Sequence, residues 1–291
     1  MEHQKPPIQK VRETVKAKKT GEVIIPNEVV NLHFPEGASL SLLASKLFVQ
    51  IVDEAGANIT ADKEHKILFS AINWSHRDLG SLENVVRELQ RTIIEIDVKS
   101  SNGRAAKESA SILGKVVREI DTEAGELQFK FSETFRNVVA NSSHWASIHA
   151  RAVLAMEGKY SPWLYQLCAM LAGRRENEWT YDLDDLRSRL GANAPSMQRW
   201  PDFRRYALDP AIAEINHLTG LDVDYVPVKR GRRVVAITLI VGKKYGEAVE
   251  DARKELNNVR TGRKARRTGM VEKIADEKKT LAAKLNPTPQ D

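Results

Sequence analysis

The chain has 291 residues, of which 42% are hydrophobic and 29% are charged, as in an ordinary globular protein of more than one domain. No apolar run approaches the ~20 residues of a membrane span, and the basic start of the chain lacks the apolar segment of a secretory signal peptide. We therefore expect a soluble, cytoplasmic protein with no membrane partner. The formal net charge of +6 favours polyanionic partners without identifying one.

Basic residues gather at three places, namely residues 1–20, 229–233 and 253–267, whereas acidic residues are spread between them. We expect a basic, flexible arm at residues 1–22 and a basic tail, helical or disordered, at residues 246–291. Such charged ends are usually just solvated, but this tail could add nonspecific affinity for DNA. The single cysteine, Cys168, lies in an apolar run and is expected to pack in the core.

The first half of the chain alternates between helical and strand-like patterns. Apolar residues at spacings of three and four predict helices, Ser81 is a typical N-cap, and a period of two predicts a strand. The expected elements are a helix at Ser39–Ala55, a short apolar strand at Lys66–Phe69, a short helical segment at Ala71–Trp74, a helix from Ser81, a strand at Thr92–Val98, and a hairpin of Ile112–Ile120 with Glu126–Phe131.

The second half repeats this order of elements with little residue identity. Pro162 suits a first helical turn, and Gly191 and Gly220 suit helix ends. The expected elements are a helix over His144–Met156 that continues into Tyr160–Leu171, a strand at Trp179–Tyr181, helices at Leu183–Leu190 and Trp200–Leu218, and a hairpin of Leu221–Val228 with Arg233–Val241.

Helix, short strand, helix, helix and hairpin is the order of a winged helix, a helix-turn-helix with a β wing. We therefore predict an α+β fold of two tandem winged-helix domains, at residues 23–143 and 144–245. In such domains the second helix of the helix-turn-helix enters the major groove of DNA. We call this second helix the reading helix.

The candidate reading helix of the second domain begins with Gln198, Arg199, Arg204 and Arg205. The planar guanidinium of arginine matches guanine and phosphate, and glutamine pairs well with adenine. Alternatively, Arg204 and Arg205 are exposed helix charges satisfied by Asp202 and Asp209.

The hairpin turn of this domain carries Lys229, Arg230, Arg232 and Arg233. Four cations at one tip repel each other unless an anion is near, and a wing beside a reading helix contacts the DNA backbone or the minor groove. A turn that merely adds solubility is the alternative.

In the first domain Asn84, Arg87 and Arg91 share one helix side and are weaker DNA-binding candidates, because Glu83 and Glu88 dilute the charge. A structural or dimerising role competes there.

No enzyme is expected. The seven histidines are scattered, and the pair His144 and His149 has a spacing that does not share a helix face. Asp182, Asp184 and Asp185 cluster at a helix start, where the helix dipole explains them. No glycine-rich phosphate loop is present. We expect no catalytic residue, no metal and no cofactor.

The block of residues 159–241 resembles the plasmid replication initiator family. In that family the reading helix of the second winged-helix domain begins with a tryptophan, which is followed two residues later by aspartate and phenylalanine. A basic pair and a Leu-Asp-Pro-Ala-Ile stretch come next. The matching residues here are Lys159–Leu167, Leu183–Gly191, Trp200, Asp202–Phe203, Arg204–Arg205, Leu208–Ile212 and Glu214–Asn216. Residues 24–140 agree in layout only.

The resemblance implies a bacterial initiator that binds direct repeats, or iterons, in origin DNA as a monomer. It also implies repression of its own promoter as a homodimer and recruitment of a host initiator and the replicative helicase. It assigns DNA contacts to Gln198, Arg199, Arg204, Arg205 and the four wing cations, with Trp200 and Phe203 in the core. Ile93–Val98 or the hairpin Ile112–Phe131 is our candidate dimer interface. A winged-helix repressor or partition protein is the alternative.

Overall fold

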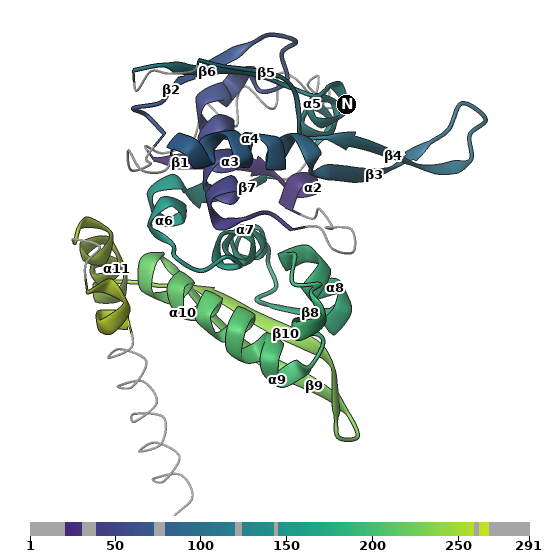
Figure 1. Ribbon diagram of the computed structural model, residues 1–291. Coiled ribbons are helices and arrows are strands. Elements are labelled where there is room, and N and C mark those ends of the chain that lie inside the picture. The colour runs from purple at the N-terminus through teal and green to yellow at the C-terminus, as the bar shows by residue number, and fades with distance from the viewer. Residues whose placement is uncertain are drawn as a thin grey trace, which may run out of the picture.

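The computed structural model describes residues 21–30, 39–72, 79–119, 124–142, 145–258 and 262–267. Figure 1 shows two units, one above the other, with α7 (Ser161–Ala172) between them. The first unit contains β1 (Glu22–Pro26), α2 (Asn27–Val30), α3 (Leu42–Ala55), η1 (Gly56–Asn58), β2 (His65–Leu68), α4 (Leu79–Arg91), β3 (Ile93–Lys99), β4 (Ala105–Ser111), β5 (Leu113–Arg118), β6 (Glu126–Phe131), α5 (Glu133–Asn141), β7 (Trp145–His149) and α6 (Ala150–Ala155).

Helix α3 forms the centre of the first unit because its apolar spacing buries Leu47, Phe48 and Ile51. Ser41 caps its start by accepting a hydrogen bond from the Ala44 amide. The Ser41 hydroxyl donates to Glu88 at 2.8 Å, so the cap also joins α3 to α4.

The predicted hairpin forms as β5 and β6, and β2 pairs with the other edge of β6, in the sheet order β2-β6-β5. The expected strand at Thr92–Val98 forms as β3. Its antiparallel partner β4, with the sequence Ala-Ala-Lys-Glu-Ser-Ala-Ser, was not predicted. In Figure 1 this second hairpin, β3–β4, projects away from the unit.

The expected helix over His144–Met156 is wrong in its first half. Trp145–His149 is strand β7, which pairs antiparallel with β1, and only α6 is helical. The alternating burial of β7 fits a strand. The expected segment Ala71–Trp74 is a turn at residues 71–72, and its remainder lies outside the described residues, as do residue 144 and most of the β5–β6 turn.

The second unit follows α7 and has the predicted order. It contains β8 (Glu178–Asp182), α8 (Leu183–Leu190), η3 (Pro195–Met197), α9 (Trp200–Phe203), the π-helical turn η4 (Arg204–Leu208), α10 (Asp209–Leu218), β9 (Leu221–Arg230) and β10 (Arg233–Lys243). The strands form a sheet of order β8-β10-β9. The wing strands are longer than expected, because Arg233 pairs with Arg230 and leaves a turn of two residues. Gly231 has a φ of 63° there, a conformation that favours glycine.

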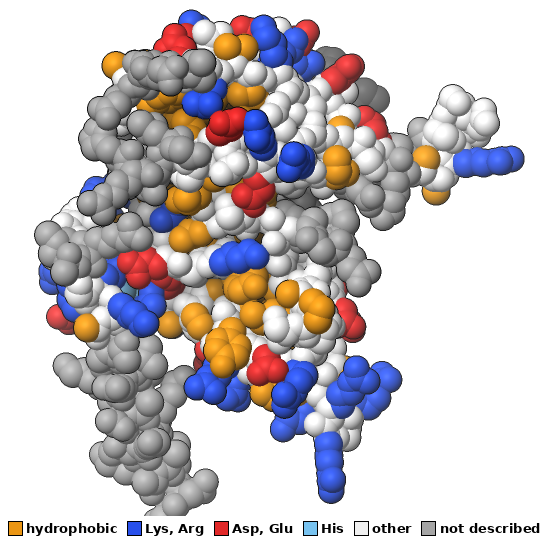
Figure 2. Space-filling view, viewed as in Figure 1, with side chains coloured by type: hydrophobic (Ala, Val, Ile, Leu, Met, Phe, Trp, Pro, Cys, Tyr) orange, Lys and Arg blue, Asp and Glu red, His pale blue; other side chains and the backbone are white. Residues whose placement is uncertain are grey.

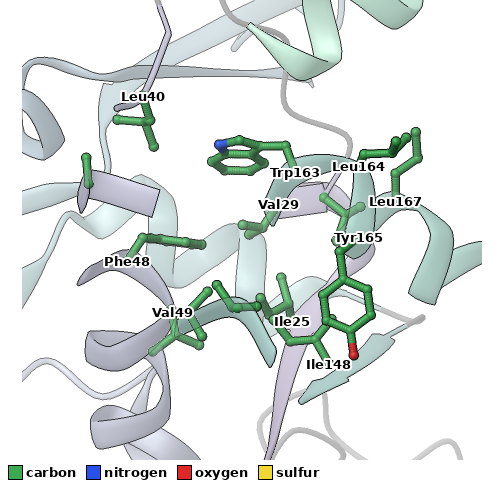
Figure 3. Close-up of a cluster of buried hydrophobic side chains, with 14 of the residues drawn as sticks. Ile25, Val29, Leu40, Phe48, Val49, Ile148, Trp163, Leu164, Tyr165 and Leu167 are labelled. Atoms are coloured by element: carbon green, nitrogen blue, oxygen red, sulfur yellow. The ribbon is translucent and has the colours of Figure 1, made fainter. Parts of the chain in front are cut away.

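Helix α7 is buried on nearly all sides because both units pack on it. Trp163 stacks on Phe48 of α3 with ring centroids 6.1 Å apart, and its indole N–H donates to the Ser45 hydroxyl at 3.0 Å. Figure 3 shows Trp163 and Phe48 in this cluster, with Ile25 of β1 and Ile148 of β7 nearby. Cys168 is fully buried on α7.

The chain continues into α11 (Glu247–Asn257) and a helical turn at residues 263–267. In Figure 1 α11 lies at the end of α10 remote from the wing. No helix in the described ranges is both long enough and apolar enough to span a bilayer.

Candidate nucleic-acid interface

Helix α8 fixes the start of the candidate reading helix through Arg187, which is almost fully buried. The guanidinium donates to Asp184 at 2.6 Å and to the Gln198 carbonyl at 2.7 Å, and it lies 5.3 Å from the centre of the Phe203 ring. An arginine held by charge, hydrogen bond and ring face together is rigid. The helix-turn-helix therefore presents its second helix in a defined position.

The reading helix, residues 200–218, is one helix with a wide turn inside it. Pro210 has no N–H to donate to the carbonyl four residues earlier, and its ring would clash with that carbonyl. The widened turn η4 accommodates the proline, and the Asp209 amide donates to the Arg204 carbonyl, five residues back. Arg204 and Arg205 are exposed beside this turn, whereas Ala207 is buried.

The alternative that acidic neighbours satisfy these arginines holds only in part. Arg204 lies 3.5 Å from Asp209, while Asp202 pairs with Arg199, at 3.7 Å. Both pairs are exposed and weak. Arg205 forms no ion pair with any described residue; its guanidinium lies 5.6 Å from the centre of the Tyr206 ring.

The wing carries the most exposed group of cations in the second unit. All four predicted residues are exposed, and none forms an ion pair with a described residue; they are Lys229, Arg230, Arg232 and Arg233. Figure 2 shows Lys and Arg side chains gathered at the wing tip and at the adjacent end of the reading helix. This end of the molecule is therefore strongly positive.

A hollow of about 550 Å³ lies where α8, the reading helix and the wing meet. The helix start contributes Gln198 and Arg199, and the wing contributes Arg232 and Arg233. The structure thus brings together candidates that lie more than thirty residues apart in the sequence. A polyanion in this hollow would contact helix and wing at once.

The first-unit candidates are exposed on α4, but acidic side chains lie closer to them than to the wing cations. Arg87 forms an ion pair with Glu83, which also receives Arg118 at 3.3 Å. Arg91 has no ion pair among the described residues, and Asn84 is exposed beside it. Other cations of this unit are also paired, as Lys66 is with Glu126 at 2.7 Å. Of the three first-unit candidates, only Arg91 is therefore a cation without an ion pair among the described residues, whereas all four wing cations lack one.

Tyr206 is a surface residue that the sequence reasoning missed. Tyr206 is 57% exposed and lies on the reading helix between Arg205 and the buried Ala207. An exposed aromatic ring directly after the basic pair Arg204–Arg205 could have suggested a DNA contact through thymine methyl groups. Phe203 is fully buried, as expected of a core residue. Trp200 is only partly buried: its ring packs on Phe203 with centroids 6.4 Å apart, and it also lines the hollow.

The acidic cluster at the start of α8 has structural partners. Asp182 caps the helix by accepting from the Asp184 amide at 2.9 Å, and Asp185 pairs with Arg189 at 2.9 Å. Among the described residues, no three His, Cys, Asp or Glu side chains are grouped to hold a metal ion.

The described part of the basic tail is helical, one of the two forms expected for it, and its added affinity for DNA remains a prediction. Residues 247–257 form α11, and Arg263, Arg266 and Arg267 point at buried carboxylates instead of solvent. Arg260 and everything after Arg267 lie outside the described residues.

Comparison with known proteins identifies both units. The family model "Initiator Replication protein, WH1" matches residues 23–169, and "Initiator Rep protein, WH2" matches residues 182–241. No curated protein sequence matches the chain. These matches confirm the predicted α+β fold of two winged-helix domains.

Solved structures resemble the chain at low identity. The Pi initiator protein in complex with iteron DNA aligns with a TM-score of 0.51 at 19% identity, covering 77% of this chain and 98% of that one. Domains 2 and 3 of RctB align at 0.42 and 11%, covering 70% and 81%. The WH1 domain of MSBI1.176, a replication protein isolated from a multiple sclerosis patient, aligns at 0.29 and 15%, covering 34% and 78%. The first of these supports the tandem fold.

Proposed function

Because the chain belongs to the initiator Rep protein family of plasmid replication initiators, we propose that it starts replication by binding directly repeated sites in origin DNA. In this proposal the reading helix of the second unit enters the major groove, and the wing contacts the flanking backbone. The protein acts without catalytic residues or a cofactor, by binding and positioning DNA.

The exposed cations around the hollow are the observation that carries this proposal. Gln198, Arg199, Arg204 and Arg205 contact base edges and nearby phosphates, and the four wing cations contact phosphates. Anions close to the unpaired wing cations relieve their mutual repulsion, and binding releases counterions from the DNA. Asn84, Arg87 and Arg91 make a secondary contact, with Arg91 contributing most because it has no acidic partner among the described residues.

Self-association belongs to the first unit in this proposal. The β3–β4 hairpin projects from the unit in Figure 1, and Ile93 at its base is 41% exposed. Two such hairpins can pair edge to edge, giving a homodimer that represses the protein's own promoter while monomers bind the origin repeats. A monomeric mass at micromolar concentration in light scattering would remove the dimer from the proposal.

Assembly of the replication machinery follows origin binding. We propose that the bound protein recruits a host initiator and the replicative helicase in the bacterial cytoplasm. Pull-down of purified helicase by the protein on origin DNA, compared with the protein alone, tests this step.

A repressor or partition protein of the same family fold is the competing function. Half-sites of a dimer mirror its twofold symmetry, so a repressor predicts a single inverted repeat. Several direct repeats beside an AT-rich segment favour an initiator.

Footprinting of the wild-type protein on its own plasmid DNA at two salt concentrations decides between these outcomes. Protection of evenly spaced direct repeats supports the proposal. Absence of sequence-specific protection at either salt concentration overturns it. Arg204→Ala with Arg205→Ala is the matched variant, and it should erase the repeat pattern while leaving weak, salt-sensitive binding.

A further inference from the structure

The segment after the wing forms a structural unit that neither family model covers. We call residues 247–258 and 262–267 the C-terminal clasp; they contain α11 and the helical turn at 263–267. The matched ranges end at residues 169 and 241. The contacts that this segment makes with the rest of the protein therefore indicate its role.

Glu214 is the first anchor of the clasp. It lies on α10, in the second half of the reading helix, and is 1% exposed. Its two carboxylate oxygens accept the Glu157 and Gly158 amides, each at 2.9 Å. Arg267 of the clasp donates to the same carboxylate at 2.7 Å. One buried charge thus joins the reading helix, the loop at residues 156–160 and the clasp.

Gly158 shows how closely this carboxylate approaches the loop. A Cβ atom at that position would lie 3.0 Å from the Glu214 carboxylate and 2.5 Å from the Ser161 hydroxyl. A side chain would push the loop away from the reading helix.

Arg263 and Glu255 form the second anchor, with side chains 5% and 7% exposed. Arg263 donates to Glu255 at 3.2 Å and to the Ala155 carbonyl, at the end of α6, at 3.1 Å. Arg266 donates to Glu255 at 2.8 and 2.6 Å. Arg151 of α6 reaches Asn257 of α11 at 3.0 Å.

In these contacts the guanidinium groups of the clasp arginines pair with carboxylates of the protein itself. A buried ion pair can be neutral in net stability, but removal of one partner is costly because it leaves an uncompensated buried charge. Arg263, Arg266 and Arg267 therefore balance Glu214 and Glu255. Binding of these arginines to DNA phosphate would expose two buried carboxylates.

We propose that the C-terminal clasp is a positioning element for DNA recognition, which fixes the reading helix to the loop between α6 and α7 and thereby sets the angle between the two winged-helix units. Helix α6 packs on α3 of the first unit, so the chain of contacts runs from the first unit through the loop to α10. The link to DNA rests on the proposed function, whereas the mechanical link does not.

Arg267→Gln tests the clasp, with Arg253→Gln as the matched control. Arg253 is an exposed arginine on α11 whose partner Glu250 is also exposed, so the control removes the same charge without touching the anchors. The first readout is amide hydrogen exchange in DNA-free protein. The second is the affinity for one complete origin repeat over a series of salt concentrations.

For Arg267→Gln we expect exchange at residues 156–160 to rise at least tenfold while exchange in the wing strands stays at the wild-type rate. Affinity for the complete repeat should fall about tenfold with an unchanged salt slope. A half-repeat contacted by the second unit alone should bind variant and wild type equally. Arg267→Lys, which keeps the charge and one donor, should restore both readouts, and the control should change neither.

A phosphate contact would give the opposite pattern. In that case Arg267→Gln lowers the salt slope by about 0.9 and leaves loop exchange unchanged, which overturns the proposal, as does no change in either readout. If Arg267→Gln fails to fold, Arg266→Gln tests the second anchor instead, because Arg266 donates to Glu255 and is 35% exposed, so its loss is milder. Exchange should then rise in α11 and at the end of α6, where Glu255 and the partner of Arg263 lie, and unchanged exchange there overturns the proposal. If the wild-type protein binds no repeat, the proposed function fails. Loop exchange alone then still tests whether the clasp holds the loop at residues 156–160 on the reading helix.

Discussion

At the scale of single residues, DNA binding depends on which cations lack an acidic partner. Arg204 and Arg205 are adjacent in sequence, yet only Arg204 has a carboxylate within reach, at 3.5 Å. The sequence predicted both as exposed, and this is confirmed. It could not predict that three arginines of the tail turn inward, because their partners lie on α10 and α11 and meet only in the folded chain.

Replacing Arg204 and Arg205 together by alanine should weaken binding to a specific repeat by about 2–6 kcal/mol, since each good base contact contributes about 1–3 kcal/mol. The fold should survive because both side chains are exposed. Fluorescence anisotropy with specific and scrambled DNA measures the loss, and circular dichroism checks the fold. Arg175→Ala, an exposed arginine at the opposite end of the sheet from the wing tip, serves as the control. Equal losses on both DNAs would mean that the pair contacts phosphate only.

Acidification should destabilise the protein between pH 7 and pH 5 through three histidines that are buried or partly buried. Burial lowers the pKa of His65, His149 and His217 below the ordinary value near 6.5. The unfolded chain therefore takes up protons in this range before the folded chain does, so stability is full above pH 6.5 and falls as the pH falls.

The carboxylates contribute only at lower pH. The hydrogen bond from Arg266 is the main cause that lowers the pKa of Glu255 to about 2, so its stabilisation persists until the pH falls below about 4.5. Thermal melts at pH 7 and pH 5 check the histidine effect. A melting temperature that does not change over this range would show that these histidines titrate normally in the folded state.

At the scale of elements, the sequence predicted those helices and strands whose own residues carry a clear period. Helix α3 and the pair β5–β6 formed as expected. Strand β4 was missed because Ala105–Ser111 has no alternation of apolar and polar side chains, and it is fixed by pairing with β3. Strand β7 was taken for a helix because its partner β1 lies far away in sequence. The distant partner decides the structure in both cases.

The wing acts as one electrostatic element. Replacing Arg230 and Arg232 by glutamine should lower the salt slope of DNA binding by about 1.8 if each neutralises one phosphate. Stability should hardly change, since both side chains are exposed and neither has an ion pair among the described residues. A filter-binding titration over a range of salt concentrations measures the slope. Lys63→Gln, an exposed cation of the first unit, should leave it unaltered, and an unaltered slope in the wing variant would assign the wing a solubility role.

At the scale of the whole molecule, the expected boundary between residues 143 and 144 falls immediately before β7. That strand pairs with β1, and α7 packs against both units. Composition and periodicity describe each unit separately, so they predicted the order of elements in the second unit but not the helix that the two units share. The cations around the hollow could likewise be predicted from the sequence, but the hollow itself could not, because its shape depends on how α8, α9 and the wing meet.

The shared helix makes the stability of the two units interdependent. Trp163→Ala removes the stacking on Phe48 and the hydrogen bond to Ser45, and should cost about 3–5 kcal/mol, as for other large buried aromatic residues. Because Trp163 belongs to α7 while Phe48 and Ser45 belong to α3, the loss should lower the urea midpoint of both units together. Hydrogen exchange can follow each unit separately during unfolding. Trp163→Phe, which keeps a ring on Phe48 but loses the indole donor, should cost only about 1–2 kcal/mol. If only the second unit became less stable in Trp163→Ala, α7 would belong to that unit alone, and the angle between the units would depend on the clasp without support from the core.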